Sequence, residues 1–175
     1  MSFTLNAYID QHISCYGNAD GYIQAECTPS GNYEFTLKRN KQPDIVNNTG
    51  TFKPLKPGTY KVYAVNTDDG EEMVSSKLKV TQPLKLKVKF EFISYPEIID
   101  GVGTVQANIT GGSPLLQPYL VTWKDVNGNI MNDLLTNNFA TVMDLPAGKY
   151  SVTIEDDNGC FLTKSFKLPI HNPLG

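Results

Sequence analysis

The sequence predicts an all-β protein of two tandem β-sandwich domains, at residues 1–82 and 83–175. Two observations lead to this fold class: one pattern of residues occurs twice along the chain, and the apolar runs alternate with a period of two. A third observation is that no window carries the apolar stripe of an amphipathic helix. Residues 129–135 have room for one helical turn at most.

The duplication is seen in two blocks that recur in the same order. Residues 55–65, LKPGTYKVYAV, recur as LPAGKYSVTIE at 145–155, a shift of 90 positions. Residues 21–25, GYIQA, recur as GTVQA at 103–107, a shift of 82 positions. The matches in the first block are Leu55 with Leu145, Gly58 with Gly148, Tyr60 with Tyr150 and Val62 with Val152. Such self-similarity indicates repeated structural units, with copies of about 80 and 90 residues.

The periodicity is that of half-exposed strands. In residues 84–92, LKLKVKFEF, every second side chain is apolar and the others are Lys or Glu. This alternation places all the apolar side chains on one face of a sheet. Similar runs lie at 22–27, 33–38, 59–65, 75–80, 104–109, 119–123, 140–145 and 163–168.

Turn signals rich in Gly, Asn, Asp and Pro separate these runs. They are Asn18–Gly21, Ser30–Asn32, Asp69–Gly70, Gly111–Pro114, Asn127–Gly128 and Asn158–Gly159. Short strands joined by turns, in units of 80 to 90 residues, are typical of immunoglobulin-like sandwiches. The sequence therefore predicts one such domain on each side of Gln82.

Composition excludes several classes of function. The net charge is −3 and Arg39 is the single arginine, so we expect no binding to nucleic acid. No stretch approaches the roughly 18 consecutive apolar residues of a membrane span, and the first residues, MSFTLNAYIDQHIS, lack the pattern of a secretory signal. We therefore expect either a chain that is not exported by that route or a piece of a larger protein.

Residues 13–23, ISCYGNADGYI, resemble the opening of the SprB-type repeats in large surface adhesins of Bacteroidetes bacteria. The first copy keeps Ser14, Cys15, Gly17, Asp20 and Gly21 of that opening, and then Leu55, Gly58 and Tyr60. The second copy keeps Gly111, Gly112, Pro118, Tyr119, Trp123, Leu145, Gly148, Tyr150, Asp156, Gly159 and Cys160. The resemblance implies an immunoglobulin-like fold and no particular ligand.

The cysteines depart from the family pattern, in which one repeat carries a cysteine at each end. Cys15 and Cys160 each lack that partner in their own copy, and Cys27 ends an alternating run. We therefore expect three free thiols, as in a protein that folds in a cytoplasm. A bacteriophage of such bacteria reconciles the resemblance with reduced thiols, because its virion proteins fold in the host cytoplasm.

Each candidate for chemistry has a structural alternative. His12 and His171 stand in no catalytic motif, and no nucleophile constellation is present. The acidic loops at 68–72 and 155–157 are candidates for calcium or for solvated hairpin turns. Trp123 and Tyr119 could stack on a sugar or belong to the core. Lys85, Lys87 and Lys89 could bind a phosphate surface or form the solvent-exposed face of a strand. In each case the structural reading is favoured.

We therefore assign no catalytic, cofactor-binding or metal-binding residue and expect no enzyme. The expected function is that of an auxiliary (decoration) capsid protein, or another virion protein, that cements or decorates the particle. Its partners would be the major capsid protein or other virion subunits, with no nucleic acid and no membrane, and it would be assembled in the host cytoplasm. The alternative is a fragment of a Bacteroidetes cell-surface adhesin that binds a surface glycan.

Overall fold

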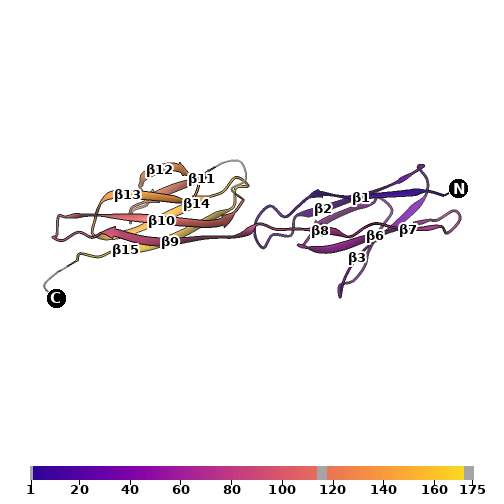
Figure 1. Ribbon diagram of the computed structural model, residues 1–175, viewed down its shortest axis with the longest axis horizontal. Coiled ribbons are helices and arrows are strands. Elements are labelled where there is room, and N and C mark those ends of the chain that lie inside the picture. The colour runs from indigo at the N-terminus through magenta and orange to yellow at the C-terminus, as the bar shows by residue number, and fades with distance from the viewer. Residues whose placement is uncertain (1, 114–117, 172–175) are drawn as a thin grey trace. The chain divides into compact units, whose positions relative to one another are not determined.

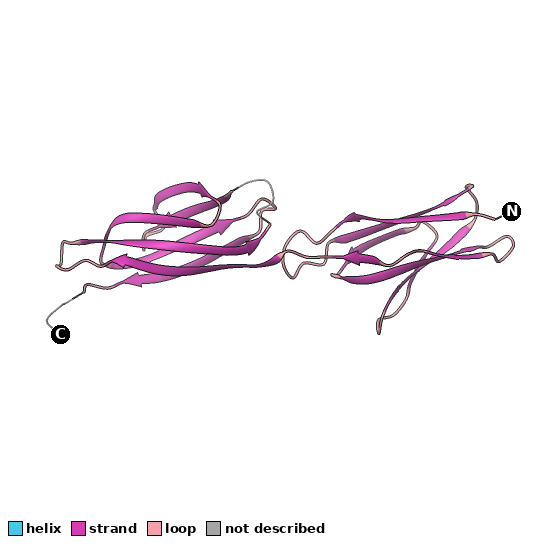
Figure 2. Ribbon diagram, viewed as in Figure 1, coloured by secondary structure: helices cyan, strands magenta, loops and turns pink. Residues whose placement is uncertain are grey.

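The computed structural model describes residues 2–113 and 118–171 of the chain. The regular structure in these residues consists of β-strands, so the predicted all-β, immunoglobulin-like fold class is confirmed (Figure 2). The chain divides into two compact units, Met1–Pro83 (unit 1) and Leu84–Gly175 (unit 2). The division falls one residue beyond the boundary expected from the sequence.

Unit 1 is a sandwich of two antiparallel sheets. One sheet has the order β1-β2-β5, formed by Thr4–Gln11, Gly21–Thr28 and Thr51–Leu55. The other has the order β4-β3-β6-β7, formed by Ile45–Asn47, Tyr33–Arg39, Gly58–Asn66 and Glu72–Val74, and β8 (Leu78–Val80) also pairs with β6.

Unit 2 repeats this arrangement. Its three-stranded sheet has the order β13-β10-β9, formed by Phe139–Pro146, Val102–Gly112 and Leu84–Ser94. Its four-stranded sheet has the order β12-β11-β14-β15, formed by Ile130–Thr136, Tyr119–Lys124, Gly148–Glu155 and Phe161–Leu168 (Figure 1). Strand by strand, β9 corresponds to β1, β10 to β2, β11 to β3, β12 to β4, β13 to β5, β14 to β6, and β15 to β7 with β8. The duplicated sequence therefore encodes a duplicated sandwich.

Six strands lie outside the alternating runs of the sequence: β1, β4, β5, β7, β12 and β14. Of these, β14 lies in the duplicated block 145–155. Strand β12 occupies Ile130–Thr136, where the sequence left room for a helical turn. Its residues pair with β11 from Tyr119 with Thr136 to Lys124 with Ile130. Because its first four residues are all exposed, on both faces of the strand, β12 has little of the alternation that reveals a half-buried strand.

The alternation predicts which side chains form the core. In β6, Tyr60, Val62 and Ala64 are buried, while the residues between them face outward. Each sandwich has its own cluster of buried apolar side chains, which includes Phe52 in unit 1 and Trp123 in unit 2. Burying a side chain of this size stabilises the fold by roughly 1.5–3 kcal/mol.

The repeated Leu-x-x-Gly-x-Tyr block forms the same corner in both units. The hydroxyl of Tyr60 donates to the carbonyl of Lys56 at 2.7 Å, and the hydroxyl of Tyr150 donates to the carbonyl of Pro146 at 2.7 Å. This tyrosine corner is a hallmark of immunoglobulin-like sandwiches, where it fixes the connection that crosses from one sheet to the other. Both rings are at least nine-tenths buried.

We predict that Tyr60→Phe destabilises unit 1, and Tyr150→Phe unit 2, by about 1–2 kcal/mol, because each leaves a carbonyl without its donor. Amide hydrogen exchange will report the loss strand by strand. The control is Tyr63→Phe on the outer face of β6, for which we expect a change below about 0.5 kcal/mol. Equal protection factors in Tyr60→Phe, Tyr150→Phe and the control would show that the corner contributes nothing to stability.

Candidate interaction surfaces

Four of the family-like residues of unit 2, Gly111, Tyr119, Asp156 and Cys160, meet at one end of the sandwich. The carboxylate of Asp156, with 6% of its surface exposed, accepts backbone N–H groups from Ser113 at 2.8 Å, Asn158 at 3.0 Å and Cys160 at 2.9 Å. The hydroxyl of Tyr119 donates to the carbonyl of Gly111 at 2.5 Å. Asp156 therefore closes the turn between β14 and β15 and also holds the end of β10. We call this set the Asp156 lock.

Two glycines at this end of the sandwich, Gly111 and Gly112, are required because neighbouring atoms leave no room for a side chain. Gly111 has φ +85°, and a Cβ there would lie 2.1 Å from the carbonyl oxygen of Lys85. A Cβ on Gly112 would lie 2.6 Å from the carboxylate of Asp156. A side chain at Gly111 would clash with the backbone of β9, and one at Gly112 would clash with Asp156 of the lock. Pro114, the last residue of the predicted turn signal, lies outside the described residues.

We predict that Asp156→Ala lowers the free energy of unfolding of unit 2 by about 2–3 kcal/mol, because buried amides lose a charged acceptor. Trp123 is the single tryptophan and lies in the unit 2 core, so its fluorescence during urea unfolding reports this unit. The matched control is Asp157→Ala, an exposed neighbour. A loss in Asp157→Ala equal to that in Asp156→Ala would contradict the assignment of the lock.

The opening stretch, residues 13–23, is a strand connection closed by its own side chains. Asp20 accepts a hydrogen bond from the amide of Ser14 at 3.1 Å and a second one from the Ser14 hydroxyl. The Ser14 hydroxyl holds the pKa of the Asp20 carboxyl below its usual value, so this contribution to stability is lost as acid protonates Asp20. Gly17 has φ +89°. The stretch therefore forms the connection from β1 to β2, and its own side chains close the turn.

The acidic loops are organised by their own backbone. In the first loop, Asp69 accepts the amide of Glu71 at 3.0 Å, and Asp68 accepts the side-chain amide of Asn32 at 3.2 Å. In the second, Asp156 forms the lock. Among residues 2–113 and 118–171, no group of three or more His, Cys, Asp or Glu is placed to hold a metal ion. The turn interpretation accounts for these carboxylates.

The two histidines lie in different units, and each takes part in a hydrogen bond with a backbone group. The Nδ1 atom of His12 accepts the amide of Thr81 at 3.1 Å, which ties the end of β1 to the end of β8. The amide of His171 donates to the carbonyl of Pro96 at 2.8 Å, and its ring lies 5.8 Å from that of Tyr95. The row of Lys85, Lys87 and Lys89 is exposed on β9, an edge strand of its sheet, where charges oppose pairing between molecules.

Trp123 belongs to the core, as does Tyr119, so the core interpretation is confirmed against sugar stacking. Trp123 is 1% exposed and meets Phe166 edge-on at 5.9 Å between ring centroids. Its indole Nε1 is the one buried side-chain polar atom in the described residues that has no hydrogen-bond partner. Such an atom costs about 1–3 kcal/mol.

We predict that Trp123→Phe destabilises unit 2 far less than Trp123→Ala, because the phenyl ring fills much of the space and removes the unpaired N–H. We expect a loss of about 3–5 kcal/mol for the alanine variant and about 1 kcal/mol for the phenylalanine variant. Urea unfolding followed by circular dichroism measures both. Equal losses would mean that the indole N–H carries no penalty.

The expectation of three free thiols is wrong for two of the cysteines. Cys15 and Cys160 are both disulfide-bonded. Cys27 is free and half-buried against the core of unit 1, and burial raises the pKa of its thiol. Because disulfides persist in oxidising compartments, the cysteines no longer argue for a protein that remains in a cytoplasm.

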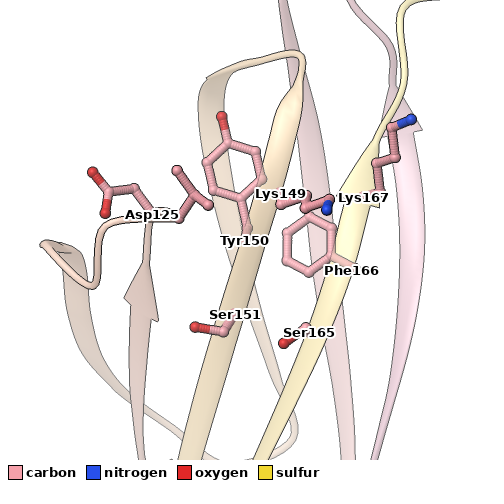
Figure 3. Close-up of a pocket in the computed structure, with 8 residues that line it drawn as sticks. Asp125, Lys149, Tyr150, Ser151, Ser165, Phe166 and Lys167 are labelled. Carbon is pink, nitrogen blue, oxygen red and sulfur yellow. The ribbon is translucent and has the colours of Figure 1, made fainter.

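Both units have a depression at the same place, where the first residues of β6 or β14 meet the neighbouring strands. In unit 2 it has a volume of about 490 Å³, and Tyr150 and Phe166 line it between Asp125 on one side and Lys149 and Lys167 on the other (Figure 3). In unit 1 it has a volume of about 450 Å³ and is lined by Lys38, Asn40, Thr59, Tyr60, Lys61, Tyr63 and Lys77.

Exposed apolar side chains are concentrated in unit 2. Fifteen of the twenty large apolar side chains that are exposed in the described residues belong to it. Unit 2 therefore has more exposed apolar side chains than unit 1. Ile98 and Ile99, in the loop between β9 and β10, are 69% and 82% exposed. With Glu97, Asp100 and Ile170 they surround a hollow of about 470 Å³. We call this region the isoleucine loop.

The isoleucine loop was not identified from the sequence, although a signal was present. Adjacent isoleucines inside a turn segment, at the place where the first copy has Tyr16 and Gly17, contradict the rule that turns are polar. Large exposed apolar residues in one place mark surfaces that bind another molecule.

No protein-family model matches the chain, and no curated protein is similar to it. Among solved structures, it is similar to an amphioxus IgVJ-C2 molecule (12% identity, TM-score 0.36, 96% of each chain) and to fibronectin(III)-like modules of Clostridium thermocellum CbhA (13%, 0.38, 95% of each). It is also similar to domains 4 and 5 of the S-layer protein SbsC (14%, 0.40, 97% of each).

The strand order and the tyrosine corners of the chain itself define the class, which is a pair of immunoglobulin-like sandwiches. Sandwiches of this class carry many unrelated functions, so function has to be argued from surfaces. In the described residues no helix is long and apolar enough to cross a membrane.

Proposed function

We propose that the chain is a non-enzymatic structural and binding protein that attaches to a larger assembly through the isoleucine loop of unit 2. The observation that carries this proposal is the exposure of Ile98 and Ile99, at 69% and 82%. Side chains of this kind gain roughly 1.5–3 kcal/mol each when a partner covers them. A loop that presents two of them to water is suited to insertion into a pocket of another protein.

The surroundings of the loop favour a protein partner. Glu97 and Asp100 flank the two isoleucines, and Ile170 lines the same hollow. An apolar centre with a charged rim is the usual composition of a protein interface. A partner with an apolar pocket and basic residues around it would complement this loop.

The absence of enzymatic activity is part of the proposal. The hydroxyl of Thr81 lies 3.2 Å from Nδ1 of His12, but this nitrogen already accepts the Thr81 amide, and the pair is exposed at a strand end. Asp20 and Asp156 are occupied by backbone amides. His12, Asp20 and Asp156 therefore stabilise the fold through hydrogen bonds from backbone amides.

The assembly that we propose is a virion, on which the chain is an auxiliary, decorating subunit bound to the major capsid protein or to another virion subunit. The supporting argument is the resemblance to SprB-type repeats of Bacteroidetes together with the exposed isoleucines, which suit attachment to a neighbouring subunit. A phage protein of such a host satisfies both.

The second candidate is a segment of a Bacteroidetes cell-surface adhesin that binds a surface glycan. The disulfide-bonded state of Cys15 and Cys160 favours this candidate, because cell surfaces are oxidising. The resemblance to adhesin repeats supports it as well. In this case the isoleucine loop would contact a neighbouring part of the surface layer.

Mass spectrometry of purified virions and of the washed surface fraction of host cells separates the two candidates. We expect the chain in the virions, and its presence in the surface fraction alone would overturn the virion proposal in favour of the adhesin.

Reconstitution on the isolated assembly then tests the loop. We expect Ile98→Ser with Ile99→Ser to weaken binding about a hundredfold, from roughly 1.4 kcal/mol per side chain. The matched control is Phe161→Ser, another exposed apolar residue of unit 2 at 74% exposure, for which we expect less than about a twofold change. Wild-type binding by the loop variant would overturn the attachment site.

A further inference from the structure

We propose that the depression of unit 1 is a binding site for a carboxylated glycan, such as a chain of uronic acids. The inference goes beyond the proposed function, because it assigns a ligand to unit 1 whether the chain belongs to a virion or to a cell surface. It rests on the distribution of charge in unit 1, on the lining of the depression, and on comparison with the equivalent depression of unit 2.

Charge is segregated along unit 1. All of its basic residues lie in the half that contains the start of β6: Lys38, Arg39, Lys41, Lys53, Lys56, Lys61, Lys77 and Lys79. Six of its nine acidic residues lie toward the opposite end, and Asp10, Asp20 and Asp44 share the basic half with the eight basic residues. The six are Glu26, Glu34, Asp68, Asp69, Glu71 and Glu72. Although the whole chain is acidic, with a net charge of −3, this half of unit 1 has a positive field that attracts anions.

The depression lies within the basic half. The strand register places Lys38 of β3 opposite Lys61 of β6, and the start of β8 brings Lys77 alongside. The one ion pair among the described residues joins Lys38 Nζ to Asp44 Oδ2 at 3.5 Å, with both side chains about half exposed. Three ammonium groups therefore share one nearby carboxylate, so the site has an excess of positive charge.

The other lining groups suit a sugar. Asn40 offers an amide and Thr59 a hydroxyl, and the ring of Tyr63 lies 4.8 Å from Lys38 Nζ on the outer face of the sheet. A uronic acid carries a carboxylate for the lysines and hydroxyls for the amide and hydroxyl groups. A ligand with only carboxylates would leave the neutral groups unused.

Unit 2 provides an internal control, because its depression has the same position and a different lining. The register places Ser151 where unit 1 has Lys61, and Ser165 where it has Lys77. Lys124 pairs with Ser151 as Lys38 pairs with Lys61, so the next residue, Asp125, stands at the position of Arg39. Figure 3 shows Asp125 among the side chains that line the depression of unit 2. The depression of unit 2 is lined by two lysines, Lys149 and Lys167, and one carboxylate. Its excess of positive charge is therefore smaller than that of unit 1, where three lysines share one carboxylate.

The experiment titrates the full chain, labelled with ¹⁵N, with a galacturonic acid hexamer at low salt. We expect chemical-shift changes at the backbone amides of Lys38, Thr59, Lys61 and Lys77, and none at the equivalent positions of unit 2. Binding should weaken at about 0.5 M NaCl, because exposed charges are screened.

The variants identify the contacts. We expect Lys61→Gln with Lys77→Gln to raise the dissociation constant about tenfold, since each exposed pair contributes up to about 1 kcal/mol. The matched control, Lys149→Gln with Lys167→Gln in unit 2, should change it less than about twofold. Unchanged spectra away from the depression will show that both variants are folded.

Two comparison ligands decide the class of molecule. Maltohexaose, which is neutral, should give no shifts, and hexaglutamate should bind more weakly than the galacturonic acid hexamer. Equal binding of maltohexaose, equal or tighter binding of hexaglutamate, or shifts of equal size in both units would overturn the inference. None of these outcomes bears on the isoleucine loop, which lies in unit 2.

Discussion

In each sandwich a tyrosine hydroxyl donates to a carbonyl four residues upstream, at 2.7 Å in both units. The bond closes the corner at which the chain leaves the three-stranded sheet and enters the larger one, which contains β6 in unit 1 and β14 in unit 2. Leu55 and Leu145 are buried at the start of this corner, and β6 and β14 begin directly after it. Because β6 and β14 are central in their sheets, the pairing of the neighbouring strands depends on where the corner places them.

The two copies share this scaffold but differ in the residues of their surfaces. The corner, the strand order and the buried alternation are common to both units, while the exposed positions differ in chemistry. Unit 1 carries an excess of lysines around its depression, where unit 2 has Ser151 and Ser165. Unit 2 carries two exposed isoleucines where unit 1 has a glycine turn with an exposed tyrosine, Tyr16. Such divergence is expected when two copies keep one core and acquire separate contacts.

The residues that carry the family resemblance turned out to be structural. Gly111, Gly112, Tyr119 and Asp156 form one hydrogen-bonded and sterically closed cluster, and Asp20 closes the opening stretch. A resemblance based on such residues predicts the fold and is silent on the ligand. The disulfide-bonded state of Cys15 and Cys160 shows the limit from another side, since the residues around each cysteine did not reveal that it is oxidised.

The sequence by itself determined the fold class, the duplication and much of the core, because alternation with a period of two is a local property that burial imposes on half-exposed strands. It predicted Trp123 in the core and the turn at Gly128, which has φ +84°. Only the tertiary structure decided β12, whose exposed residues carry no alternation. It also decided the Asp156 lock, because Asp156 and its donor Ser113 are 43 residues apart in the sequence. It also decided both surfaces, since Lys38, Lys61 and Lys77 come together through strand pairing, and the exposure of Ile98 and Ile99 depends on what the fold leaves uncovered.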